Sequence, residues 1–174
     1  MKFYSGFSFS NEDELFSSLI KESEYTVCGF SYGAIKAFEY VKESLKNTKR
    51  VDTLQLFSPA FFQTKPDKFK RLQTLAYAKN NEKYLSQFRE SCFSPYTIKE
   101  VSASRQTNKE DLEELLQYEW SLDALKDLES KGVIIEVYLG GEDAIIDVMA
   151  AQEFFLQVAT VTYVKSANHC LQIN

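Results

Sequence analysis

The sequence has 174 residues, 44% of them hydrophobic and 26% charged, and its formal net charge at pH 7 is −5. This length and composition predict a single globular domain, residues 1–174, with a core large enough to fold alone. The acidic balance, 25 Asp and Glu against 20 Lys and Arg, argues against nucleic acid as a partner.

The cysteines, the histidine content and the hydropathy of the chain indicate which cofactors and which cellular compartment to expect. The three cysteines show no C-x-x-C spacing and the chain has one histidine, so neither a disulfide framework nor a metal site is indicated. No nucleotide-binding glycine loop is present, and we expect no cofactor. Met1 is followed by no signal-peptide pattern, and no apolar run approaches the ~20 residues of a membrane span. We expect a cytoplasmic protein, monomeric and without a membrane partner.

The N-terminal part of the chain predicts two strands with a helix between them. The first strand covers residues 2–6 and leads into a glycine-containing loop through Phe7. A helix is expected from about Asn11 to Lys21. The second strand is expected at residues 25–29, where β-branched and apolar residues dominate.

Residues 29–33 form a Gly-x-Ser-x-Gly motif: Gly29-Phe30-Ser31-Tyr32-Gly33. Apolar residues recur at helical spacing after it, from Ala34 to Leu45. A strand, a sharp turn and a helix around this motif are typical of the nucleophile elbow of serine hydrolases. Gly29 and Gly33 would remove side chains that collide with neighbouring elements at a strained turn. The pattern predicts Ser31 as a catalytic nucleophile, with a serine in an ordinary tight turn as the alternative.

Residues 50–57 predict a third strand, but the segment from Ser58 to Gly132 has no strand pattern. It predicts four helices, near residues 66–78, 81–91, 109–117 and 121–130. The remaining elements are strands at residues 133–139 and 160–164 and a helix at residues 147–155. Large apolar residues of the long segment are expected to pack together: Phe61, Phe62, Phe69, Leu72, Leu75, Tyr77, Tyr84, Leu85, Phe88 and Trp120.

The catalytic base and acid are expected after the last two strands. The only histidine, His169, follows the final strand, as the Ser…Asp/Glu…His chain order requires. Asp143 follows the preceding strand in a glycine turn and is the predicted acid, while Glu142 is expected to face solvent. Asp147 stays open as an alternative acid, although it also suits the start of a helix.

Ester or acyl chemistry also requires two backbone N–H groups that stabilise the oxyanion. We expect one from Tyr32, directly after the nucleophile, and the other from Phe7, in the loop after the first strand. His169 would take the proton of Ser31, and Asp143 would fix the tautomer of the imidazole.

The whole pattern resembles the α/β-hydrolase superfamily and, within it, the small pimelyl-acyl-carrier-protein methyl ester esterases of biotin synthesis. The segments that carry the resemblance are residues 3–7, 28–37, 54–60, 68–73, 141–143 and 168–169. The fold class expected is α/β, a reduced α/β-hydrolase fold with about five parallel strands in the order 1-2-3-4-5 flanked by helices. The resemblance implies that residues of about 60–125, inserted after strand 3, form a helical cap over the active site. The large apolar residues of this segment named above would pack the cap and in part line an acyl channel.

Residues 63–90 hold seven Lys and Arg against three acidic residues, although the whole chain is acidic. A basic cap would attract an acidic partner, and a solvated helix face is the alternative explanation. The partner that the resemblance implies is an acyl-carrier protein bearing the methyl pimeloyl group. Its docking residues are expected to be Lys65, Lys68, Lys70 and Arg71.

The activity that the resemblance implies is hydrolysis of the methyl ester of pimeloyl-acyl-carrier protein through an acyl-enzyme, with release of methanol. A general short-chain carboxylesterase or a thioesterase of the same fold is one alternative. A hydrolase fold kept as a binding module without turnover is the other.

Overall fold

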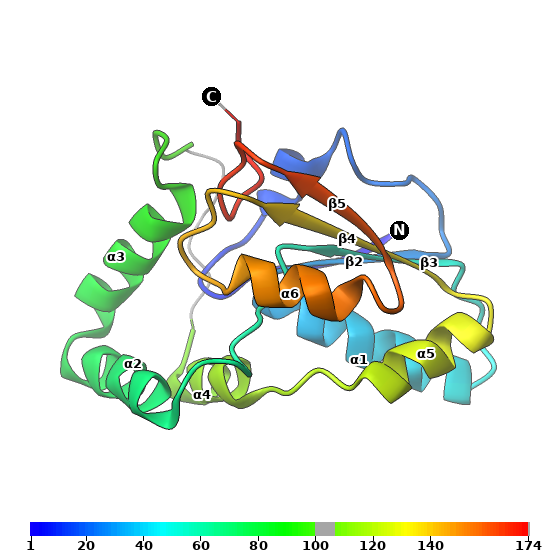
Figure 1. The fold of residues 1–174 in the computed structure, drawn as a ribbon, viewed down its shortest axis with the longest axis horizontal. Coiled ribbons are helices and arrows are strands. Elements are labelled where there is room, and N and C mark those ends of the chain that lie inside the picture. The colour runs from blue at the N-terminus through cyan, green and yellow to red at the C-terminus, as the bar shows by residue number, and fades with distance from the viewer. Residues whose placement is uncertain (100–106, 174) are drawn as a thin grey trace.

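The computed structural model describes residues 1–99 and 107–173, and this part of the chain forms one sheet with helices packed around it (Figure 1). Its parallel strands are β1 (Lys2–Tyr4), β2 (Thr26–Phe30), β3 (Thr53–Phe57), β4 (Ile134–Gly140) and β5 (Thr160–Val164). They lie in the order β1-β2-β3-β4-β5, which confirms the predicted strand order.

The helices of the described residues follow the predicted pattern closely. They are the 3-10 helix η1 (Glu12–Phe16) and the α-helices α1 (Tyr32–Lys46), α2 (Asp67–Lys79), α3 (Asn81–Phe93), α4 (Lys109–Gln117), α5 (Leu122–Ser130) and α6 (Val148–Phe155). All four helices predicted between the third and fourth strands are present, near their predicted limits. None of the helices in residues 1–99 and 107–173 combines the length and apolar character that crossing a membrane needs.

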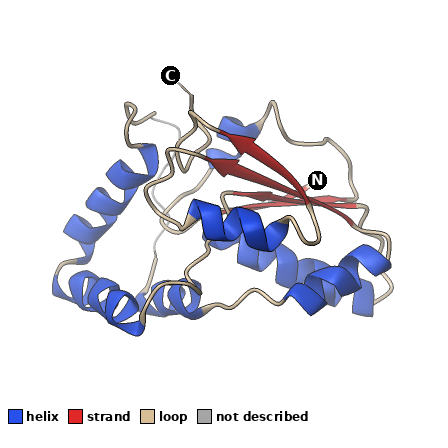
Figure 2. Cartoon of the chain, in the orientation of Figure 1, coloured by secondary structure: helices blue, strands red, loops and turns tan. Residues whose placement is uncertain are grey.

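One face of the sheet carries the main hydrophobic core. Successive side chains of a strand point to opposite faces, and Leu54, Leu56 and Val137 are buried on this face. Figure 2 shows helices grouped on one side of the sheet, and Figure 1 identifies them as α1, α5 and α6. Ile35 of α1 and Leu125 of α5 belong to the same core. This core fixes α1, and therefore the turn that precedes it, against the sheet.

The opposite face is covered largely by the N-terminal segment. Phe9 and Phe16 of this segment pack with Phe30 and Phe57 of the sheet in a second apolar cluster. The rings of Phe16 and Phe57 stack with their centroids 4.7 Å apart.

The predicted helix from Asn11 to Lys21 is wrong, because only the short η1 forms there. Gln55, buried on β3, bonds the backbone of this segment in place of helical partners. Its Oε1 accepts the N–H of Lys21 at 2.9 Å, and its Nε2 donates to the carbonyl of Leu19 at 3.0 Å. The tertiary contact therefore overrides a local helical pattern.

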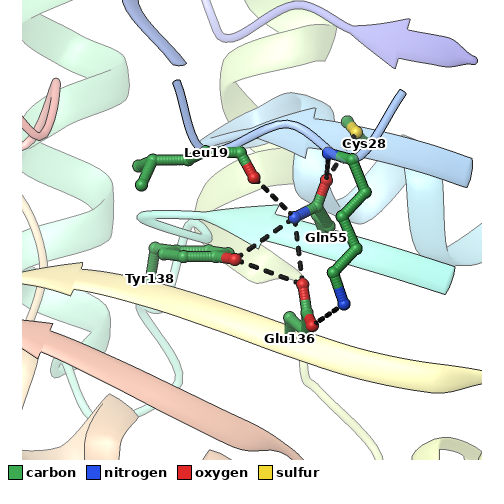
Figure 3. Close-up of polar contacts among 6 residues, drawn as sticks. Leu19, Cys28, Gln55, Glu136 and Tyr138 are labelled. Atoms are coloured by element: carbon green, nitrogen blue, oxygen red, sulfur yellow. Dashed lines mark hydrogen bonds and ion pairs between the residues drawn. The ribbon is translucent and has the colours of Figure 1, made fainter. Parts of the chain in front are cut away.

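Gln55 also joins this segment to β4 (Figure 3). Its Nε2 donates to Oε2 of Glu136 at 3.0 Å and lies 3.2 Å from the hydroxyl of Tyr138. The ammonium of Lys21 pairs with the Glu136 carboxylate. Because the buried amide has partners for both its oxygen and its nitrogen, burying it costs little free energy.

The C-terminal ends of the strands meet at one edge of the sheet. Phe30 of β2 lies beside Phe57 of β3, which lies beside Tyr138 of β4. Gly140 of β4 lies beside Val164 of β5. The loops that follow these strands therefore start from the same edge, which is where open α/β sheets bind their ligands.

The helices inserted between β3 and β4 occupy two places. α5 packs in the main core, where Leu125 and Leu128 are buried. α2 and α3 stand beyond the C-terminal edge of the sheet, with α4 next to α2 (Figure 1). The part of the insertion that lies near the strand ends is thus α2, α3 and α4.

Candidate active site

Ser31 lies in the sharp turn between β2 and α1. Its backbone has φ 52° and ψ −115°, a conformation that is costly for a non-glycine residue and that clusters at functional sites. Its N–H donates to the carbonyl of Phe57 at 2.9 Å, which ties the turn to β3. The residue is 3% exposed. The turn thus holds a strained, nearly buried serine at the edge where the strands end.

The two glycines of the motif lie where backbone segments approach closely. A Cβ at Gly29 would lie 2.3 Å from the carbonyl oxygen of Gly33, and a Cβ at Gly33 would lie 2.0 Å from that of Tyr4. Both distances are far below van der Waals contact, and the neighbouring atoms belong to backbone. Only glycine fits at either position. The loop after β1 therefore runs directly over the first turn of α1.

His169 connects the serine to a carboxylate. Its Nε2 lies 3.0 Å from the Oγ of Ser31, and its Nδ1 lies 2.6 Å from Oδ2 of Asp143. The His169 and Asp143 side chains are fully buried. When the imidazole proton is on Nδ1, the Nδ1–H group donates a hydrogen bond to the carboxylate. Nε2 is then free to take the serine proton. The structure thus brings together the three residues that the sequence predicted as nucleophile, base and acid.

The second oxygen of Asp143 is held by backbone. Its Oδ1 accepts the N–H groups of Ile145 at 2.7 Å and Ile146 at 3.2 Å. These backbone hydrogen bonds therefore fix the orientation of the carboxylate toward the imidazole.

Asp147, the alternative acid, has a different place. Its Oδ1 accepts the N–H of Ala150 at 3.2 Å and caps α6, and its Oδ2 lies 3.3 Å from the hydroxyl of Thr64. Glu142 is exposed. Within the described part of the chain, the carboxylate in contact with His169 belongs to Asp143.

The turn that carries Asp143 and the loop that carries His169 are fastened to each other. The N–H of Glu142 donates to the carbonyl of Ala167 at 2.8 Å. A Cβ at Gly140 would lie 2.3 Å from the carbonyl oxygen of Asn168, so the loop can pass only over a glycine. This contact sets the separation of acid and base.

The predicted oxyanion donors, Tyr32 and Phe7, belong to two segments that meet at the turn carrying Ser31. Tyr32 is the first residue of α1, so its N–H is one of those that lack a partner within the helix, and the helix dipole favours negative charge there. Phe7 lies in the buried loop after β1 that crosses this turn.

Sequence reasoning missed the residue that holds this loop, Glu12. Its Oε1 accepts the N–H of Gly6 at 2.6 Å, directly before Phe7. Burial raises the pKa of Glu12, and the Gly6 N–H opposes that shift. Glu12 lies in the segment expected to be helical, where an acidic residue near the start ordinarily faces solvent, so no local signal marks it.

Comparisons with known proteins identify the fold. No family model and no curated protein matches the sequence. An esterase from Exiguobacterium antarcticum matches with a TM-score of 0.63 and 17% identity, over 90% of this chain and 63% of that chain. The naproxen esterase of Bacillus subtilis matches with a TM-score of 0.55 and 18% identity, over 95% of this chain and 62% of that chain. This chain has the α/β-hydrolase fold.

BioG from Haemophilus influenzae shares this α/β-hydrolase fold with 9% identity and a TM-score of 0.59. The match covers 97% of this chain and 87% of BioG. The chain spans less than two thirds of the length of the two esterases above.

A mainly apolar cavity of about 380 Å³ lies between α2, α3 and α4, and none of the three triad residues lines it. Its lining includes Ala144 and Ile145, directly after the acid. Phe88, also in the lining, packs edge-on against Phe7 with ring centroids 5.6 Å apart. Of the predicted channel residues, those in the lining are Phe62, Phe69, Tyr84 and Phe88. Phe61 and Trp120 lie in the main core, whereas Leu72 and Leu75 are exposed.

The predicted docking residues do not all lie on the surface. Lys68 and Arg71 are exposed on α2, and Lys65 is half-buried. Lys70 is only 6% exposed, because it lies on the inward face of α2 that also carries Tyr77. The expectation that Lys70 forms part of a free surface is therefore wrong.

Proposed function

We propose that this protein is a serine carboxylesterase that hydrolyses the methyl ester of pimeloyl-acyl-carrier protein. The observation that carries the esterase assignment is the buried chain of contacts from Ser31 Oγ through His169 to Asp143, at 3.0 and 2.6 Å. The backbone of Ser31, at φ 52° and ψ −115° between a strand and a helix, fits the nucleophile elbow.

The reaction follows from these positions. His169 Nε2 takes the proton of Ser31 as the Oγ attacks the ester carbonyl, and Asp143 stabilises the imidazolium. The N–H groups of Phe7 and Tyr32 stabilise the oxyanion. His169 returns the proton to the methoxy group, which leaves as methanol. Water, deprotonated by His169, then cleaves the acyl-enzyme to the free carboxylate.

Three observations support the choice of substrate. The mainly apolar cavity, whose lining reaches Ala144 and Ile145 directly after the acid, suits the methylene chain between the ester and the thioester of a carrier-bound pimeloyl group. The exposed Lys68 and Arg71 present positive charge to an acidic carrier protein. BioG from Haemophilus influenzae matches over 97% of this chain and 87% of its own length. At 9% identity this match is a likeness of fold, so the substrate remains our proposal.

The direct test is methanol release from the methyl ester of pimeloyl-acyl-carrier protein, measured beside methyl pimelate and beside the Ser31→Ala variant. We expect release that requires Ser31 and favours the carrier-bound ester. Methanol release from the small ester alone would support the esterase activity and contradict the carrier protein as partner. Faster cleavage of an acyl thioester than of the oxygen ester would favour the thioesterase alternative.

Charge reversal on α2 tests the carrier partner. We expect Lys68→Glu with Arg71→Glu to lower kcat/KM for the carrier-bound ester about tenfold or more, because two attractions become repulsions. The loss should shrink as salt rises, and methyl pimelate should be cleaved as by wild type.

The matched control reverses Lys49, which follows α1 in the sequence, and Lys126 of α5; both are exposed, and α5 lies away from α2 (Figure 1). This pair changes the net charge by the same amount. An equal loss in the control would mean that net charge, not a docking site on α2, sets the rate.

A further inference from the structure

The side chain of Tyr32 makes contacts that the proposed mechanism does not use. Its hydroxyl donates to Oε2 of Glu114 at 2.5 Å and lies 3.2 Å from Oδ1 of Asp111. Both carboxylates belong to α4. Lys36, one turn further along α1, places its ammonium 2.6 Å from the Glu114 carboxylate and 4.8 Å from the centre of the Tyr32 ring. A group of four side chains, of which Tyr32 is buried while Lys36 and Glu114 are partly exposed, thus joins the elbow to α4.

The state of the phenol suits this contact. Tyr32 is 1% exposed, and burial, together with the two carboxylates, raises its pKa above its usual range. The pKa of Glu114 is lowered overall, since the contacts with Lys36 and Tyr32 outweigh the opposing effect of burial. The pair is therefore a neutral donor and a charged acceptor, the stronger kind of hydrogen bond.

α4 is also a wall of the acyl cavity. Leu112, Leu115 and Leu116 of α4 line it, and these leucines flank Glu114 in the sequence. A movement of α4 that changes the cavity must therefore move Glu114 and pull on the Tyr32 side chain. The backbone N–H of the same tyrosine faces the oxyanion in the proposed mechanism.

We propose that the Tyr32 side chain is a positioning residue that couples occupation of the acyl cavity to the oxyanion site. An acyl chain that seats against the α4 leucines fixes α4, and the Tyr32–Glu114 bond transmits that order to the first turn of α1. Esters with short acyl groups do not reach α4 and gain nothing from it. The inference rests on the proposed esterase function and adds to it a source of chain-length selectivity.

The chain contains a matched control for this bond. The hydroxyl of Tyr118, just after α4, donates to Oε1 of Glu39 on α1 at 2.8 Å, and Lys42 pairs with Glu39 at 2.9 Å. The same three residue types thus join the same two helices about two turns further from the nucleophile. Tyr118→Phe removes an equivalent bond without touching the elbow.

The first experiment compares Tyr32→Phe with Tyr118→Phe on p-nitrophenyl acetate and octanoate. We expect Tyr32→Phe to lower the octanoate-to-acetate ratio of kcat/KM about tenfold, the size of one hydrogen bond to a charged group, and Tyr118→Phe to change it less than about twofold. Equal changes of the ratio in the two variants would overturn the proposal. If Tyr32→Phe does not fold, Glu114→Ala removes the same bond from the α4 side and should lower the ratio alike.

A second readout does not depend on turnover. In Ser31→Ala, methyl octanoate should slow amide hydrogen exchange in residues 32–36, and this effect should vanish when Tyr32→Phe is added. The coupling is contradicted if exchange is still slowed in the Tyr32→Phe protein, or if it is not slowed when the Tyr32 hydroxyl is present. A protein that binds methyl octanoate and shows the coupling but cleaves no ester would instead contradict the proposed function alone.

Discussion

Replacing Ser31 by Ala should lower kcat/KM for an ester by about 10⁴-fold or more, and His169→Ala should lower it to a similar level. The Oγ of Ser31 and the Nε2 of His169 lie 3.0 Å apart and carry out one step together. The double variant should therefore lose little beyond either single variant. Steady-state rates with p-nitrophenyl acetate measure all three.

Circular dichroism of each variant serves as the control for folding, because Ser31 and His169 are almost fully buried. A folded Ser31→Ala protein within tenfold of the wild-type rate would rule out the nucleophile. Losses that multiply in the double variant would mean that the two residues act in separate steps.

Replacing Asp143 by Asn should lower kcat by about 10³- to 10⁴-fold. An amide at this position cannot accept the Nδ1 proton and also keep the backbone bonds from Ile145 and Ile146, so it favours the wrong tautomer of His169. KM should change little, because the carboxylate is buried behind the imidazole and does not face the cavity. A pH series of kcat checks that the loss persists where His169 is neutral.

Asp147→Asn is the matched control, because it makes the same change to the alternative acid four positions further along. Asparagine caps helices about as well as aspartate, so α6 should keep its start and the rate should stay within about twofold of wild type. If Asp147→Asn lost most of its activity while Asp143→Asn stayed active, Asp147 and not Asp143 would be the acid of the triad.

The sequence alone determined most elements of this fold. Alternation and helical spacing placed all five strands and the helices between β3 and β4 close to their observed limits. These patterns are local, since they record which side of each element meets the core. The Gly-x-Ser-x-Gly turn was also predictable from the sequence. Its glycines are required by close backbone contacts within the strand–turn–helix unit and with the adjacent β1 loop.

The local pattern misled where a distant residue supplied the partners. Residues 11–21 look helical in isolation, but Gln55 of β3 bonds the N–H of Lys21 and the carbonyl of Leu19, and the helix that forms is only η1. Lys70 looks like part of a basic surface, but its place on α2 turns it inward beside Tyr77. In both cases the decisive contact joins elements whose relative placement depends on the packed core.

The sequence predicted which residues could form a triad, and only the tertiary structure decided between Asp143 and Asp147. Chain order and residue type restrict the candidates, whereas orientation selects the carboxylate that faces His169. The sequence predicted some residues of the cavity, such as Phe62 and Phe88, but not which of the predicted set would line it, and the bond between Tyr32 and Glu114 left no sequence signal. Each is made by side chains far apart in the chain, and their contact depends on how helices pack, which no short-range pattern records.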